Sequence, residues 1–172
     1  MKRHLILVGL PGAGKTTVGR LVADSLGAPL VDIDAMIVRK MQMPVASIFG
    51  ALGEAAFRKM ESEAMAVALA GPPSVLSPGG GWVVQPGQLE AARANSYLVY
   101  LKAMLATLGK RTSGDASRPL LAGEEPLDAL RTLLKDREPY YLQADAEVKS
   151  DVRTPEQVAE EVVALARAHA GW

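Results

Sequence analysis

The stretch "GLPGAGKTT", residues 9–17, directly follows the apolar run "HLILV", residues 4–8. It matches the pattern G-x-x-x-x-G-K-[ST] at every position and lies between a run typical of a buried strand and a segment with helical periodicity. In such a loop, glycines let backbone N–H groups converge on phosphate oxygens, and the dipole of the following helix favours negative charge. The stretch therefore predicts a strand–loop–helix unit that binds the phosphates of a nucleotide.

Lys15 and Thr16 give this loop its chemistry. A lysine at this position reaches the β- and γ-phosphates of a nucleoside triphosphate, and the hydroxyl of the next residue ligates Mg²⁺. In the alternative interpretation, the stretch is a glycine-rich turn that contains a lysine by chance. The complete pattern and its place between a strand and a helix argue against this alternative. The predicted phosphate contacts are Gly12, Ala13, Gly14, Lys15, Thr16 and Thr17.

The composition is that of one ordinary globular domain, residues 1–172. Lys+Arg and Asp+Glu both number 19 and the pI is about 6.7, so charge gives no reason to expect a nucleic acid or an anionic membrane as partner. The chain has no Cys and only two His, His4 and His169, which leaves little for a thiolate site, a His-based triad or a His-ligated metal. No apolar segment approaches the roughly 20 residues that cross a bilayer, and we expect a cytoplasmic monomer.

Apolar runs and helical patterns alternate along the chain. We predict strands over residues 5–8, 28–34, 74–77, 97–101 and 146–150. Helices are predicted from the phosphate loop to Gly27, over most of residues 47–71, over residues 88–94, 103–110 and 126–141, and from Pro155 onward. This alternation predicts a three-layer α/β fold, in which helices cover both faces of a mainly parallel sheet. Ligands of such folds bind at the carboxyl ends of the strands.

Residues 111–125, "RTSGDASRPLLAGEE", show no periodicity. A stretch of this length inside a compact domain is more often functional than a plain connection. We therefore predict a mobile lid over these residues.

Asp32 and Asp34 stand at the end of the second predicted strand, where alternation would point both side chains the same way. One carboxylate could hold a Mg²⁺-bound water while the other orients an acceptor hydroxyl. In an alternative interpretation, Asp34 only caps a helix that begins at Ala35. The third predicted strand ends without a carboxylate, which leaves Asp32 as the nearest candidate for Mg²⁺.

Two arginines suggest the charge of the acceptor. Arg58 has Glu54 and Glu61 at i−4 and i+3, a spacing that also fits a surface ion pair. Arg137 lies where a following proline predicts a break in the helix. Guanidinium forks suit carboxylates, and the glycine triplet at residues 79–81 lets the backbone approach a ligand, although by spacing alone it could be a turn.

Several segments form an ordered set along the whole chain. They are "GLPGAGKTTVGRLVA", "DID", "IFGALGEAAFRKMES", "GGG", "SRPLL" and "REPYY". The phosphate loop is shared by many unrelated nucleotide-binding proteins, but the combination of D-x-D, F-R-x-x-E, GGG, R-P-L-L and R-x-P-x-Y is specific. In this combination the chain resembles the shikimate kinases from end to end. The resemblance implies a five-stranded parallel sheet of the nucleoside-monophosphate-kinase kind. It also implies Mg²⁺-dependent phosphoryl transfer from ATP to the 3-hydroxyl of shikimate, in aromatic amino-acid biosynthesis.

The resemblance also implies roles for individual residues. Asp34 would bind the acceptor hydroxyls and is the candidate base, while Lys15 and Arg118 would contact the phosphates of ATP. The implied acceptor contacts are Asp34, Arg58, Gly79, Gly80, Gly81 and Arg137, with Glu61 supporting an arginine and Phe49 and Phe57 lining the apolar part of the pocket. The implied nucleotide contacts outside the phosphate loop are Arg111, Arg118, Arg153 and Pro155. Thr16 and Asp32 are the metal candidates.

Pro78 and Trp82 flank the glycine triplet where smaller residues are expected, so the pocket floor could differ in shape. A gluconate kinase is the nearest alternative, because it shares the phosphate loop and a sugar-acid acceptor, but it is not expected to combine GGG with R-P-L-L. A GTPase would need an N-K-x-D motif, which the sequence lacks. A non-catalytic relative would be favoured by loss of Lys15, Asp34 or Arg118, and all three are present.

Overall fold

The computed structural model describes residues 1–113 and 125–172. Among them lies a parallel sheet of five strands in the order β2-β3-β1-β4-β5. The strands are β1 (His4–Val8), β2 (Leu30–Asp32), β3 (Val75–Ser77), β4 (Ser96–Lys102) and β5 (Ala146–Lys149). The helices are α1 (Lys15–Leu26), α2 (Ile33–Met41), α3 (Val45–Ala70), the short 3₁₀ helix η1 (Trp82–Val84), α4 (Gln88–Arg93), α5 (Leu105–Thr112), α6 (Pro126–Tyr141) and α7 (Pro155–His169).

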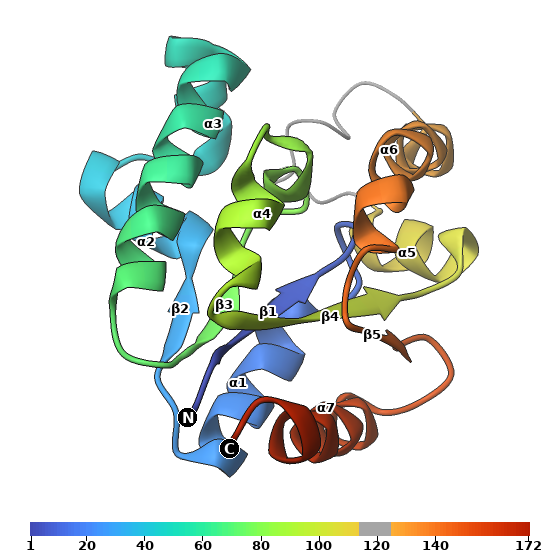
Figure 1. The fold of residues 1–172 in the computed structure, drawn as a ribbon. Helices are drawn as coiled ribbons and strands as arrows, with labels where there is room; N and C mark the ends of the chain where they lie inside the picture. Colours follow the sequence, from blue (N-terminus) through green and yellow to red (C-terminus); the bar gives the residue numbers. More distant parts are fainter. Residues whose placement is uncertain (114–124) are drawn as a thin grey trace.

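The central strand β1 is apolar because helices cover both faces of the sheet. Helices α1 and α7 pack together on one face, and α4 and α6 lie on the opposite side (Figure 1). Leu5, Ile6 and Leu7 have no exposed surface, and burying each such side chain contributes about 1.5–3 kcal/mol. The predicted three-layer α/β fold is confirmed. Within the described ranges, no helix combines the length and apolar character needed to span a bilayer.

The second strand is shorter than predicted and ends at Asp32. Asp32 caps α2, because its side chain accepts a hydrogen bond from the backbone N–H of Ala35 at 3.1 Å, and Asp34 lies in the first turn of that helix. The prediction that both carboxylates project from one strand was therefore wrong, as was the alternative that Asp34 is the cap. The capping bond of Asp32 starts the helix before strand alternation can reach Asp34.

Helix α6 spans Pro126–Tyr141, as predicted, but it runs through Pro139, so the break predicted after Arg137 does not occur. A proline removes one backbone N–H, and its ring crowds the carbonyl four residues earlier. The helix continues because Tyr141 is fully buried and its hydroxyl donates to the carbonyl oxygen of Gly80 at 2.7 Å. Arg137 therefore stands on a continuous helix, on the same face as Tyr141.

Helix α5 reaches Thr112, so the predicted lid cannot begin at residue 111. Arg111 belongs to the last turn of this helix, which ends two residues beyond the predicted end at residue 110. The rest of the predicted lid, residues 114–124 with Arg118, lies outside the described residues.

Candidate active site

A cavity of about 730 Å³ opens where β1, β2 and β3 end. Most of the residues that the sequence singled out meet in its wall. They are Gly12, Ala13, Gly14, Lys15, Thr16, Thr17, Asp32, Asp34, Phe49, Phe57, Arg58, Gly79, Gly80, Gly81, Arg111, Arg137 and Pro155. Glu61 and Arg153 are not part of this wall. One continuous cavity thus joins the phosphate loop to the glycine triplet.

The phosphate loop needs glycine where it enters α1. Gly14 is the N-cap of this helix and has a φ of 96°, a left-handed conformation that residues with a side chain rarely adopt. The ammonium group of Lys15 donates to the carbonyl oxygens of Gly9, at 2.7 Å, and Leu10, at 3.1 Å. Its positive charge is therefore held against the loop, at the helix terminus where anions are bound most favourably.

Thr16 and Asp32 bring two oxygen ligands together beside the loop. The Thr16 hydroxyl donates to Oδ2 of Asp32 at 3.1 Å, while Oδ1 of Asp32 caps α2. Mg²⁺ prefers oxygen ligands and is usually held by one or two protein groups together with substrate phosphates and water. This donor pair therefore fits a magnesium ion that enters with a nucleotide.

Arg58 pairs with two carboxylates in different surroundings. It donates to Glu61 at 2.9 Å and to Glu54 at 3.3 Å. The side chain of Glu61 is fully buried, whereas that of Glu54 is 52% exposed. The surface-pair interpretation thus describes Glu54 but not Glu61. Burial raises the pKa of the Glu61 carboxyl, and the neighbouring Arg58 guanidinium opposes the rise.

The glycine triplet packs directly against two arginines. A Cβ on Gly81 would stand 2.6 Å from Cζ of Arg58, and a Cβ on Gly80 would stand 2.7 Å from Nη1 of Arg137. Both distances are shorter than real Cβ contacts, so the loop reaches the guanidinium groups only because it lacks side chains there. The triplet is therefore more than a turn, since it lets two cationic forks converge on one place.

Asp34 approaches the same loop from α2. A Cβ on Gly79 would stand 3.3 Å from Oδ1 of Asp34 and 2.3 Å from Oε1 of Glu61. Of these two acids, Asp34 lines the cavity and Glu61 does not. Of the two acids that approach Gly79, Asp34 is thus the one that shares a cavity with both the phosphate loop and the arginines.

Phe49 and Phe57 supply an apolar wall. Their ring centroids lie 4.9 Å apart with the planes tilted by 45°. The Phe57 ring centroid also lies 5.6 Å from Cζ of Arg58, within cation–π range. Aromatic rings beside paired guanidinium groups suit a small acceptor that has a hydrocarbon face and a carboxylate.

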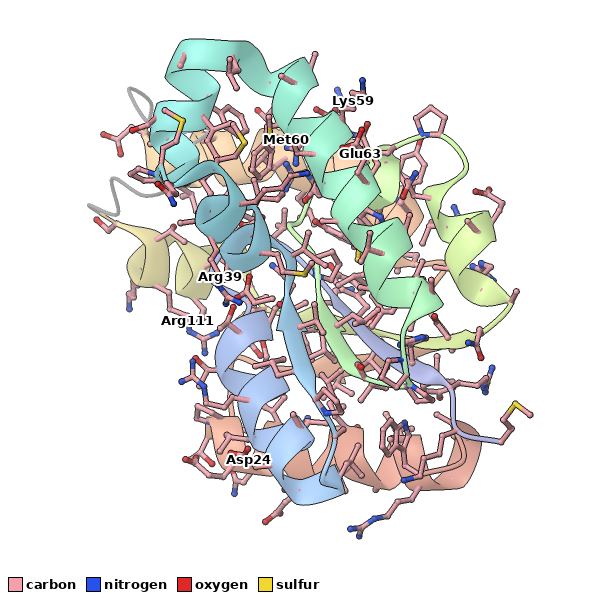
Figure 2. All side chains as sticks on the ribbon, turned by 90° about the vertical axis from the view of Figure 1, so that its left-hand side faces the viewer. Asp24, Arg39, Lys59, Met60, Glu63 and Arg111 are labelled. Atoms are coloured by element: carbon pink, nitrogen blue, oxygen red, sulfur yellow. The ribbon has the colours of Figure 1, made fainter. Side chains whose placement is uncertain are left out.

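The two arginines predicted to flank adenine lie in different places. Arg111 donates to the carbonyl oxygens of Gly12 at 3.0 Å and Ser150 at 2.9 Å, and lies in the cavity wall near the start of α1 (Figure 2). Arg153 instead pairs with Glu161 and donates to the carbonyl oxygen of Lys149 at 2.9 Å. The structure therefore brings Arg111, but not Arg153, into the cavity.

The two unexpected residues beside the triplet, Pro78 and Trp82, lie in different surroundings. Trp82 has no exposed surface, and its indole N–H donates to Oε1 of Gln88 at 2.9 Å. It does not line the cavity, whereas Pro78 does. Of the two, only Pro78 can therefore shape the pocket by direct contact.

Sequence reasoning gave no role to Tyr141. Its side chain is fully buried, and its hydroxyl donates to the carbonyl oxygen of Gly80 at 2.7 Å. The signal was the R-x-P-x-Y pattern, because residues four apart share a helix face. The predicted break at Pro139 concealed it.

A nucleotide-phosphate loop on a parallel sheet, facing a second binding site across one cavity, defines a P-loop kinase. Comparisons with known proteins identify the family within this class. A family model described as shikimate kinase matches residues 11–167. The shikimate kinase of Symbiobacterium thermophilum is 41% identical over 163 residues, which cover 93% of this chain and 94% of that protein.

Solved structures agree with the family model. The shikimate kinase of Acinetobacter baumannii, in complex with shikimate, has a TM-score of 0.93 and 34% identity over 98% of this chain and 94% of that chain. A gluconokinase of Sinorhizobium meliloti has a TM-score of 0.68 at 19% identity, over 99% of this chain and 94% of that chain, and so shares only the fold. The chain belongs to the shikimate kinase family. Its activity is the ATP-dependent phosphorylation of shikimate, a step in aromatic amino-acid biosynthesis.

Proposed function

We propose that the cavity binds ATP at the phosphate loop and shikimate at the glycine triplet, and that the γ-phosphoryl group passes to the 3-hydroxyl. The observation that carries this assignment is the convergence of Arg58 and Arg137 on the triplet, inside the cavity that also holds Lys15. Phosphoryl transfer needs positioning and charge stabilisation more than covalent chemistry from the protein. One shared cavity supplies both.

On the nucleotide side, the backbone of residues 12–17 and the Lys15 ammonium hold the phosphates. Thr16 and Asp32 would hold Mg²⁺, which neutralises charge on the β- and γ-phosphates when it is bound. Arg118, in the proposed lid, adds a further positive charge to the phosphates. Closure of such a lid excludes water and suppresses wasteful hydrolysis of ATP.

On the acceptor side, Arg58 and Arg137 bind the carboxylate, and Phe49 and Phe57 contact the hydrocarbon face of the ring. Glu61 does not touch the acceptor but orients Arg58 from the protein interior. Asp34 orients the reacting hydroxyl and accepts its proton late in a loose transition state.

The remaining assignments follow from this chemistry. We place the enzyme in the cytoplasm as a monomeric domain over residues 1–172, where ATP and small biosynthetic acids are its partners. Equal numbers of acidic and basic residues offer no electrostatic basis for nucleic-acid or membrane binding.

The test is ADP release from Mg-ATP with no acceptor, with shikimate and with gluconate, followed by ³¹P NMR of the product. We expect turnover with shikimate alone and a single phosphate ester at the 3-position. Omission of Mg²⁺ should abolish turnover. Equal activity with gluconate, or hydrolysis indifferent to either acid, would contradict the acceptor assignment while leaving the nucleotide site intact.

The two arginines that the resemblance placed beside adenine, Arg111 and Arg153, give a paired prediction. Arg111→Ala should raise KM for ATP about tenfold, since it removes the guanidinium that braces the phosphate loop, an effect of roughly 1.4 kcal/mol. Arg153→Ala serves as the matched control and should change KM for ATP by less than about twofold, because its partner is a surface carboxylate. Initial rates at saturating shikimate measure both. Equal increases in KM for ATP in the two variants would show that Arg153 also contributes to ATP binding.

A further inference from the structure

Tyr141 is a buried, titratable side chain for which the phosphoryl-transfer scheme has no use. It has no exposed surface, and its ring stacks on Tyr100 with centroids 5.1 Å apart and an interplanar angle of 26°. The stacked ring fixes where the hydroxyl lies. That hydroxyl donates to the carbonyl oxygen of Gly80, the central residue of the triplet, at 2.7 Å.

The same hydroxyl faces Arg137. The position of a Cβ on Gly80 lies 2.7 Å from Nη1 of Arg137 and 3.1 Å from the Tyr141 hydroxyl oxygen, so all three residues meet at one point. Burial raises the pKa of Tyr141 to about 12, while the charge of Arg137 and a hydrogen bond from it oppose the rise. The phenol thus keeps its proton at neutral pH.

A phenol that keeps its proton suits this position because its neighbours have opposite needs. A guanidinium can only donate hydrogen bonds, and a backbone carbonyl can only accept them. A hydroxyl can accept from the first and donate to the second at the same time. Phenylalanine would fill the same space but could do neither.

We propose that Tyr141 is a positioning residue for the acceptor carboxylate. The Tyr141 hydroxyl fixes the spacing between the Gly80 backbone and the Arg137 guanidinium. The inference rests on the proposed function, since it assumes that these two groups bind the carboxylate of shikimate. It assigns a purpose to the tyrosine of the R-x-P-x-Y pattern beyond filling the core.

The experiment compares Tyr141→Phe with Tyr140→Phe. Tyr140 is the adjacent residue on α6, is 38% exposed, and therefore provides a matched loss of one hydroxyl. We expect Tyr141→Phe to raise KM for shikimate about tenfold, as for loss of a hydrogen bond to a charged group, with kcat and KM for ATP within about twofold. Tyr140→Phe should leave all three constants unchanged. A merely structural role would lower Tm and affect both substrates alike.

The outcomes separate the two levels of inference. If the unchanged protein does not phosphorylate shikimate, the proposed function fails. If it does, and Tyr141→Phe behaves like Tyr140→Phe or weakens ATP and shikimate equally, only the positioning role is overturned.

A second measurement does not depend on the folding of the Tyr141 variant. The chain has four tyrosines, so uniform 3-fluorotyrosine labelling gives four ¹⁹F resonances. Those of the other three tyrosines can be identified by single Tyr→Phe substitutions, which leaves Tyr141 by elimination. Its resonance should shift on adding shikimate and not on adding ADP. If the ¹⁹F chemical shift of Tyr141 does not change on adding shikimate, the proposal is overturned.

Discussion

Asp34→Asn is expected to lower kcat by about 10²- to 10⁴-fold, the range for loss of a general base. The amide is nearly isosteric and can still hydrogen-bond a hydroxyl, but it cannot take the proton. Asp34 lines the cavity shared by the phosphate loop and the glycine triplet. Because the amide keeps the shape of the side chain and its hydrogen bond to the hydroxyl, the binding of both substrates should change much less than kcat. Steady-state rates with both substrates saturating measure the effect.

Asp24→Asn is the matched control. Asp24 is an exposed aspartate near the C-terminal end of α1, far from the labelled Arg111 (Figure 2), and it does not line the cavity. It should leave kcat unchanged. A drop of only a few-fold in the Asp34 variant would show that this carboxylate positions the hydroxyl without deprotonating it.

Arg58→Ala is expected to lose about 3–5 kcal/mol of the free energy of unfolding at neutral pH, because it leaves the buried Glu61 charge without its partner. It should also weaken acceptor binding by about 1.5–3 kcal/mol, the range for a hydrogen bond to a charged group. Chemical denaturation gives the first quantity, and KM for shikimate gives the second. The control is Lys59→Ala, an exposed neighbour on α3 (Figure 2), which should change neither.

The loss of stability should depend on pH. Arg58 is the main group that opposes the raised pKa of Glu61, so its removal raises this pKa further. For an acid whose pKa is higher in the folded than in the unfolded protein, stability is highest below the unfolded pKa and falls as pH rises through the folded value. The deficit of Arg58→Ala should therefore shrink toward pH 4.5, the ordinary pKa of Glu61, and grow toward pH 8. A deficit independent of pH would mean that Glu61 does not carry it.

Local chemistry made much of the fold predictable. The phosphate loop is one continuous segment whose glycines, lysine and following helix act on near neighbours, so its pattern could be read directly. The apolar β1 run and the helix caps are local in the same way: Thr154 and Gln157 form a capping box that begins α7 where the sequence places it. The site needed several segments together, and only their combined order in the chain suggested a common purpose.

One error arose where a distant contact outweighed a local preference, and another where two local signals competed. Pro139 favours a break, but the burial of Tyr141 and its bond to Gly80, 61 residues away in sequence, keep α6 helical. Asp34 was placed on a strand because alternation ignores the capping bond that Asp32 makes.

By itself, the sequence determined the phosphate loop and the fold class, because both depend on short segments whose physics is local. Only the tertiary structure decided which charges meet. The triplet had to be seen against Arg58 and Arg137 before its missing side chains had a meaning. Only the burial of Glu61 in the folded protein distinguishes its ion pair with Arg58 from a surface ion pair. Burial and close approach between segments far apart in the chain are properties of the packed molecule, and no spacing along the chain encodes them.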